Sequence, residues 1–134
     1  KGKLLRMSLL STEKPKQLNF SRHSAFEREV KKARVLGLEK GMEAFERLCE
    51  VHFHPTSPRG VIAPGKLHHL YDGDGWELWK IEMVVPGLRM NQMPRVWFAK
   101  SGTTFVYLAM GSHTDNYQDN ERQASATERA TECF

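Results

Sequence analysis

The densest hydrophobic pattern in the chain lies in two consecutive runs, residues 95–100 and 103–110, which are rich in β-branched and aromatic side chains. Ser101 and Gly102 form a short polar break between them, and glycine readily takes the positive φ that tight turns need. This pattern predicts a β-hairpin. The second run is apolar at both odd and even positions, so we expect a central strand that is covered on both faces.

Two amphipathic helices are predicted upstream of this hairpin. Ser24 followed by Glu27 matches the capping box that opens a helix, and we expect Gly37 to end that helix. A second helical pattern, with its apolar residues on one stripe, runs from about Glu39 to Val51. The two segments together predict a helical hairpin.

The remaining pattern predicts further strands on either side of the helical pair. Residues 77–85 alternate apolar and polar side chains, and residues 16–21 can form a short edge strand. These elements predict an α+β fold, in which an N-terminal helical hairpin packs on a small, twisted, mainly antiparallel sheet. Both helices are expected on one face of the sheet, so that the other face, or its rim, is left for a partner.

The length of 134 residues is sufficient for one domain with a full core and short for two. We expect a basic arm over residues 1–15, a single domain over residues 16–117, and a polar, acidic tail or short helix over residues 118–134. Residues 1–36 hold ten Lys and Arg against three Glu, whereas the rest of the chain carries a net charge of −3. A basic first third favours a polyanionic partner such as nucleic acid, although a solvated helix face with a basic tail gives the same count.

Composition also bears on the compartment and on the chemistry. The sequence has no apolar run near the roughly 20 residues of a membrane span and no signal-peptide cleavage pattern, so we expect no membrane association. Cys49 and Cys133 leave a single disulfide open, but a reducing cytoplasm is the simpler interpretation. The sequence lacks a glycine-rich phosphate loop, a nucleophile elbow and a dinucleotide fingerprint, which excludes nucleotide hydrolysis and dehydrogenase chemistry.

The end of the second hairpin strand carries a group of chemically active side chains. His113 can donate or accept a proton near neutral pH, and Asp115 and Tyr117 follow it closely. We interpret this stretch as a candidate site for proton transfer and base stacking, although a histidine after a strand is often structural. A second polar segment holds His68, Asp72 and Asp74, each of which is a candidate general acid or base.

Lys80 and Arg95 lie on neighbouring predicted strands and can face one phosphate together, as stabilisation of a phosphorane-like transition state requires. Cross-strand pairing with Glu77 or Glu82 would explain the same two cations structurally. The polar surface of the first predicted helix adds further candidate RNA-binding cations, namely Lys31, Lys32 and Arg34.

The histidine pairs are a weak signal for a metal. His68 and His69 are adjacent, so on a strand they would point to opposite faces and could not bind one ion together. His52 and His54 could share a face, but no third ligand stands at a metal-site spacing. We therefore expect neither a metal site nor a cofactor.

These features resemble the RelE/ParE superfamily of bacterial toxins, in particular its RelE-like and YafQ-like mRNA interferase branch. The resemblance covers about residues 16–117. Besides the helical hairpin, it rests on four short motifs at residues 66–70 (KLHHL), 79–81 (WKI), 95–98 (RVWF) and 111–117 (GSHTDNY). The last motif is similar to the YafQ-type ending Gly-Thr-His-Ser-Asp-Leu-Phe, which also keeps a histidine and an aromatic residue four positions apart. The connection over residues 86–94 is longer than the turn usual in that family.

The resemblance implies a fold related to microbial ribonucleases and a cytoplasmic toxin that cleaves mRNA in the ribosomal A site. It also implies a cognate antitoxin that masks this site in a toxin–antitoxin hetero-oligomer. His113 would be the general acid or base, and His68 a second proton-transfer group. Tyr117 would orient the substrate, while Arg95 and Lys80 would bind its phosphate. The reaction would be attack of a 2′-hydroxyl on the adjacent phosphate, without a metal.

Two other functions stay open. A ParE-like gyrase poison would act by protein contact and would not need His113 with Tyr117. A non-catalytic module would bind RNA or a protein without turnover. The acidic tail adds a hypothesis about regulation, because residues 119–134 would mimic RNA and inhibit its binding if they lay near a basic cleft.

Overall fold

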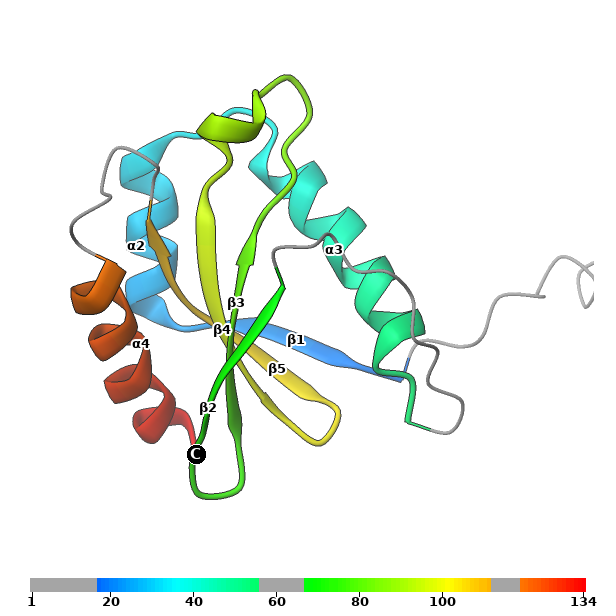
Figure 1. The fold of residues 1–134 in the computed structure, drawn as a ribbon, viewed down its shortest axis with the longest axis vertical. Helices are drawn as coiled ribbons and strands as arrows, with labels where there is room; N and C mark the ends of the chain where they lie inside the picture. The colour runs from blue at the N-terminus through cyan, green and yellow to red at the C-terminus, as the bar shows by residue number, and fades with distance from the viewer. Residues whose placement is uncertain (1–16, 56–66, 112–118) are drawn as a thin grey trace, which may run out of the picture.

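The computed structural model describes residues 17–55, 67–111 and 119–134. These residues form an α+β fold with a five-stranded mixed sheet of order β1-β5-β4-β3-β2 (Figure 1). The strands are β1 (Asn19–Arg22), β2 (His68–Asp72), β3 (Glu77–Glu82), β4 (Arg95–Ser101) and β5 (Thr104–Gly111). The α-helices are α2 (Ser24–Ala33), α3 (Leu38–His52) and α4 (Asp119–Cys133), and η1 (Met90–Gln92) is a short 3-10 helix.

The predicted β-hairpin is present and forms the centre of the sheet. β4 and β5 pair in antiparallel fashion with Ser101 opposite Thr104, and Gly102 takes a φ of +60° in the turn. β5 is buried from Phe105 to Gly111. The prediction of a central strand covered on both faces is therefore confirmed.

One edge strand of the sheet was predicted and the other was not, since β1 overlaps the short edge strand expected over residues 16–21. β1 pairs with β5 in parallel, and β2 forms within the segment that we had interpreted only as polar surface. β2 lies at the edge of the sheet, and its residues are exposed except for the half-buried Leu70. An edge strand with so little burial carries almost no apolar alternation, which is why its sequence did not predict a strand.

α2 and α3 cover one face of the sheet, as expected for the predicted helical pair. Phe26 of α2 and Phe45 of α3 belong to one buried cluster that includes Phe98 and Tyr107 of the sheet. The ring of Phe26 stacks on that of Tyr107 at 5.4 Å, and Phe45 meets the ring of Phe98 edge-on at 5.3 Å. Aromatic packing thus fixes both helices to the central hairpin.

The ends of α2 are not set by the residues that we predicted. His23 is the N-cap instead of Ser24, since its Nδ1 accepts a hydrogen bond of 3.0 Å from the Ala25 N–H. The helix ends before Arg34, which takes a left-handed conformation, and Gly37 instead precedes α3. An imidazole nitrogen can accept the capping hydrogen bond as a hydroxyl does, so the cap lies one residue closer to β1.

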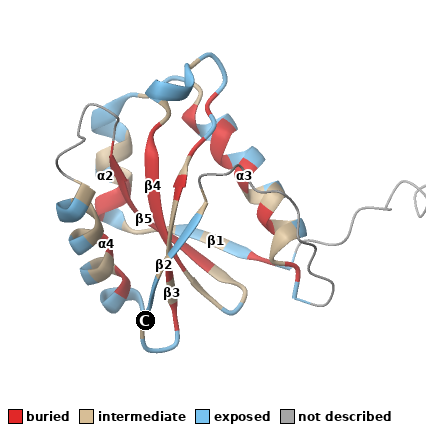
Figure 2. Cartoon of the chain, in the orientation of Figure 1, coloured by how far each residue is buried: buried red, intermediate tan, exposed pale blue. Residues whose placement is uncertain are grey.

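α4 covers the opposite face of the sheet, so this face is not left open for a partner, and a partner at its rim stays a prediction. Figure 1 shows α3 and α4 on opposite sides of the strands. Ala126 and Ala130 are fully buried in a cluster with Trp97 and Leu108, while most of α4 is exposed or intermediate in Figure 2. A stripe of alanines is only weakly apolar, which is why the sequence indicated no more than a short polar helix.

Gly41 brings α3 into close contact with the chain just after β3. A Cβ atom at this position would lie 2.6 Å from the backbone oxygen of Val84. Replacing glycine with alanine inside a helix normally stabilises it by about 1 kcal/mol, but here the helix would have to move off the sheet. We expect Gly41→Ala to lower the free energy of unfolding by about 1–3 kcal/mol in urea denaturation.

The matched control for this substitution is Glu43→Ala, at an exposed position of the same helix. We expect it to leave the free energy of unfolding nearly unchanged. A Gly41→Ala variant as stable as the original protein would contradict the close contact.

The structure shows the state of the two cysteines, which the sequence left open. Both cysteines are free, with Cys49 buried in α3 and Cys133 exposed at the end of α4, so the disulfide that the sequence left open is not formed. Burial, with the nearby carboxylates of Glu46 and Glu50, raises the pKa of the Cys49 thiol far above its ordinary value.

None of the helices in the described part of the chain combines the length and the hydropathy that a membrane span requires.

Candidate phosphate-binding site

Two of the predicted phosphate-binding cations lie together on the face of the sheet that α4 covers. In the β3–β4 ladder Lys80 is opposite Trp97 and Glu82 is opposite Arg95. Alternate residues of a strand share a face, so Lys80 and Arg95 project from the same side. Both reach one carboxylate oxygen, because Asp119 Oδ2 lies 2.9 Å from Arg95 Nη1 and 3.8 Å from Lys80 Nζ. The two cations therefore share one anion, which belongs to the chain itself.

The surroundings of this ion pair are largely closed to solvent. Arg95 is only 8% exposed, and Trp97 is fully buried. Lys80 Nζ lies 5.9 Å from the centre of the Trp97 ring, within the range of a cation–π contact. Among the described residues, Trp97 Nε1 and Asp119 Oδ1 are buried without a hydrogen-bond partner. Within the described residues, Trp97 can therefore still donate a hydrogen bond in the site, and Asp119 can still accept one.

Asp119 occupies a position where negative charge is favoured. It is the first residue of α4, and the backbone N–H groups and dipole of a helix N-terminus attract anions. Arg95 and Lys80 add two formal positive charges at the same point. This arrangement can hold one anionic oxygen, either of a carboxylate, as observed, or of a phosphate that takes its place.

His68 extends the same face to the edge of the sheet. The β2–β3 register places His68 opposite Lys80, and residues opposite one another in an antiparallel pair lie on the same face. His68, Lys80 and Arg95 therefore lie across three neighbouring strands, which are spaced about 4.8 Å apart. His68 is exposed, whereas Arg95 is buried, so the face runs from an accessible edge toward a covered centre.

His113 and Tyr117, the other two predicted site residues, lie outside the described residues. The residues that flank their segment are described, and both are beside Arg95. Gly111 is opposite Arg95 in the β4–β5 ladder, and Asp119 forms the ion pair with it.

The remaining predicted cations lie around the end of α2. Lys31 and Lys32 are exposed in its last turn, and Arg34 is its exposed C-cap. Positive side chains are stabilising at a helix C-terminus, which is a structural reason for their presence. Glu29 of the same helix binds Arg129 of α4 at 2.9 Å.

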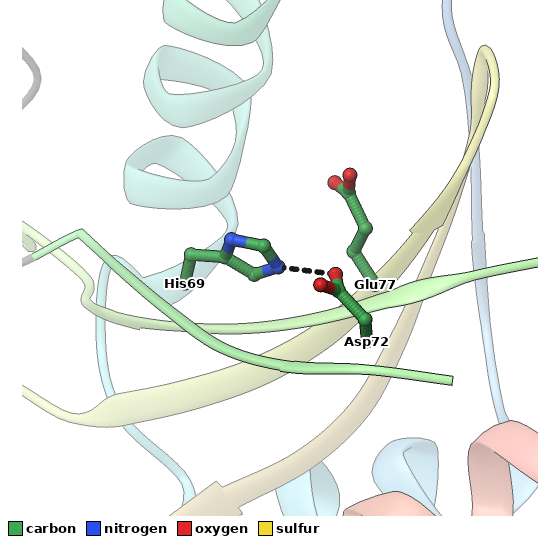
Figure 3. Close-up of side chains that lie close together, drawn as sticks. All are labelled: His69, Asp72 and Glu77. Carbon is green, nitrogen blue, oxygen red and sulfur yellow. Dashed lines mark hydrogen bonds and ion pairs between the residues drawn. The ribbon is translucent and has the colours of Figure 1, made fainter.

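A further group of polar side chains lies on the other face of β2 and was not predicted. His69 Nε2 lies 2.8 Å from Asp72 Oδ1, and Glu77 lies beside them on β3 (Figure 3). The potential ligand atoms of these three side chains are all within 4.8 Å of one another. His68 and His69 do lie on opposite faces, as predicted. The missed signal was the His-x-x-Asp spacing before a glycine-rich turn, because that turn returns Glu77 to a position opposite Asp72.

Comparisons with known proteins identified no protein similar to this chain. A scan against protein-family models gave no match. A search of curated proteins and a search of solved structures likewise gave no match. Any assignment of function therefore rests on the residues and on the geometry described above.

Proposed function

We propose that this chain is the toxin of a type II toxin–antitoxin system and cleaves mRNA on the ribosome as a RelE-like endonuclease. The observation that carries the proposal is the placement of His68, Lys80 and Arg95 on one face of three neighbouring strands, where Lys80 and Arg95 meet at one carboxylate oxygen. The α+β class of the structure is compatible with the resemblance, whereas the order of its helices differs, with α4 following the sheet.

The proposed reaction is an in-line transfer within the RNA strand. A general base removes the proton of a 2′-hydroxyl, and the freed oxygen attacks the adjacent phosphorus while the bond to the 5′-oxygen breaks. A general acid returns a proton to that leaving oxygen. His113 and His68 fill these two roles, and Tyr117 stacks on a base of the substrate.

Arg95 and Lys80 would stabilise the charge that develops on the phosphate oxygens. Both already lie within 4.0 Å of a single carboxylate oxygen, so a phosphate oxygen at that position would meet the same two cations. Their fixed positions on adjacent strands mean that little reorganisation is needed once the phosphate has entered. The partners in this proposal are the ribosome with its mRNA and a cognate antitoxin that covers the site.

The test is primer extension on mRNA incubated with translating ribosomes. We expect cuts inside A-site codons with the original protein, and a loss of about 100-fold or more in cleavage with His113→Ala, since removal of a general acid or base costs about 10²–10⁴ in rate. His54→Ala is the matched control, because it removes a histidine from a buried position at the end of α3.

Two results would contradict the proposal in different ways. Cuts that persist in His113→Ala would move the chemistry to His68 or to the aspartates. A folded protein that makes no cuts would leave gyrase inhibition or simple binding as the better account, and a DNA gyrase supercoiling assay would separate those two.

A further inference from the structure

We propose that His69, Asp72 and Glu77 form a binding site for one divalent transition-metal ion, of which Zn²⁺ fits the ligand set best. One imidazole nitrogen with two carboxylates is a ligand set that zinc accepts, whereas Mg²⁺ and Ca²⁺ prefer oxygen ligands alone. This site departs from the expectation of no metal. It lies on the face of the sheet opposite Lys80 and Arg95, and its binding of an ion is independent of the proposed nuclease.

The distances within the cluster are close to those of a metal site. Zinc bonds of about 2.0–2.2 Å place neighbouring tetrahedral ligand atoms about 3.3–3.6 Å apart. His69 Nε2 and Asp72 Oδ1 are 2.8 Å apart and share a proton, which the ion would replace. All three ligand atoms lie within 4.8 Å of one another, so small movements of these side chains would bring them to that spacing.

Trp79 orients two of the three ligands before any ion binds. The ring of His69 stacks on Trp79 at 4.8 Å with an angle of 15°, and Trp79 Nε1 donates a hydrogen bond of 3.0 Å to Glu77 Oε1. Trp79 is itself held by ring contacts with Phe53 and Phe98. Contacts of this kind fix the orientation of metal ligands and strengthen binding.

The backbone also holds the ligands in place. Asp72 and Glu77 are opposite one another in the β2–β3 ladder, and the Gly73 N–H donates a hydrogen bond of 2.7 Å to the Trp76 oxygen across the turn. Gly75 takes a φ of +83° in that turn, which glycine tolerates best. A short hairpin therefore presents both carboxylates from one rigid element.

The charges of the cluster favour a bound cation, and there is space beside the cluster. Asp72 and Glu77 carry two negative charges, and Lys100 Nζ lies 4.0 Å from Glu77 Oε1. Lys100 offsets part of this negative charge, so we expect weaker binding than at a thiolate site. A cavity of about 290 Å³ lies beside two of the three ligands and is lined in part by Asp72, Glu77 and Lys100.

The test is isothermal titration calorimetry of Zn²⁺ into the full chain after treatment with a chelator, with Mg²⁺ and Ca²⁺ titrated in parallel. We expect one Zn²⁺ per chain, bound more tightly than the other two ions, and a higher midpoint of thermal unfolding with zinc present. Asp72→Asn and Glu77→Gln keep the size of each side chain, and each should weaken Zn²⁺ binding by at least about 10-fold.

His68→Ala and Asp74→Asn are matched controls, because they change a neighbouring histidine and a neighbouring aspartate outside the cluster. Unchanged Zn²⁺ affinity in these controls, together with the losses above, would support the site. Unchanged affinity in Asp72→Asn and Glu77→Gln would overturn it, since the ion would then be held elsewhere. Absence of Zn²⁺ binding, or tighter binding of Mg²⁺ or Ca²⁺, would also overturn it. His113→Ala should not alter Zn²⁺ binding, so failure of the nuclease proposal would not be confused with failure of this one.

Discussion

Trp97→Ala is expected to lower the free energy of unfolding by about 3–5 kcal/mol, a large share of the roughly 5–15 kcal/mol that stabilises a domain. Trp97 is fully buried and packs in the cluster that joins the sheet to Ala126 and Ala130 of α4. Its removal would leave a cavity under α4 and would take away the ring beneath Lys80. Urea denaturation followed by circular dichroism measures the effect.

Trp97→Phe is the matched control for this prediction. It keeps an aromatic ring but removes Nε1, which is buried without a hydrogen-bond partner among the residues that the structure describes. Loss of an unpaired buried donor partly offsets the loss of volume, so we expect a cost below about 1.5 kcal/mol. A cost equal to that of Trp97→Ala would show that the indole N–H makes a strong hydrogen bond, contrary to this interpretation.

Asp119→Asn is expected to raise the affinity for single-stranded RNA by about 10-fold, which corresponds to roughly 1.4 kcal/mol. In the structure the carboxylate of Asp119 occupies Arg95 and Lys80, the two cations proposed to bind phosphate. Removing its negative charge weakens this internal competitor while it keeps the side chain's size. Fluorescence anisotropy with a short labelled RNA measures the change, at one fixed salt concentration because such binding depends strongly on salt.

Glu121→Gln is the control that tests whether the position of the removed charge matters, or only the change in net charge. Glu121 is an exposed carboxylate in the first turn of the same helix, so both substitutions change the net charge equally. Equal gains in RNA affinity would indicate a general electrostatic effect, and no gain in Asp119→Asn would mean that its carboxylate does not compete with RNA. Deleting residues 119–134 is a poorer test of the tail hypothesis, because Ala126 and Ala130 are buried against the sheet.

The hydrophobic pattern of the sequence predicted helices and strands correctly where their side chains are strongly buried. The hairpin of β4 and β5 and the apolar stripe of α3 were predicted because their side chains alternate with the period of the element that they form. β2 and α4 were missed or undervalued for the opposite reason. β2 is an exposed edge, and α4 buries only alanines, so neither has a strong apolar pattern.

The candidate site was predictable in part. The alternation of residues along β3 and β4 was enough to suggest that Lys80 and Arg95 share a face, and adjacency was enough to separate His68 from His69. The anion that the two cations share was not predictable, because Asp119 is 24 residues from Arg95 and reaches it only through the packing of α4. The tail hypothesis anticipated an acidic group near the cations without identifying Asp119.

The sequence alone therefore determined the α+β class, the central hairpin and the positions of the basic side chains, because each depends on the period of side chains along a few neighbouring residues. Tertiary structure decided which face α4 covers, which carboxylate the cations bind and that His69, Asp72 and Glu77 meet. These contacts depend on strand register and on the docking of a weakly apolar helix, which are set by the packing of the whole core.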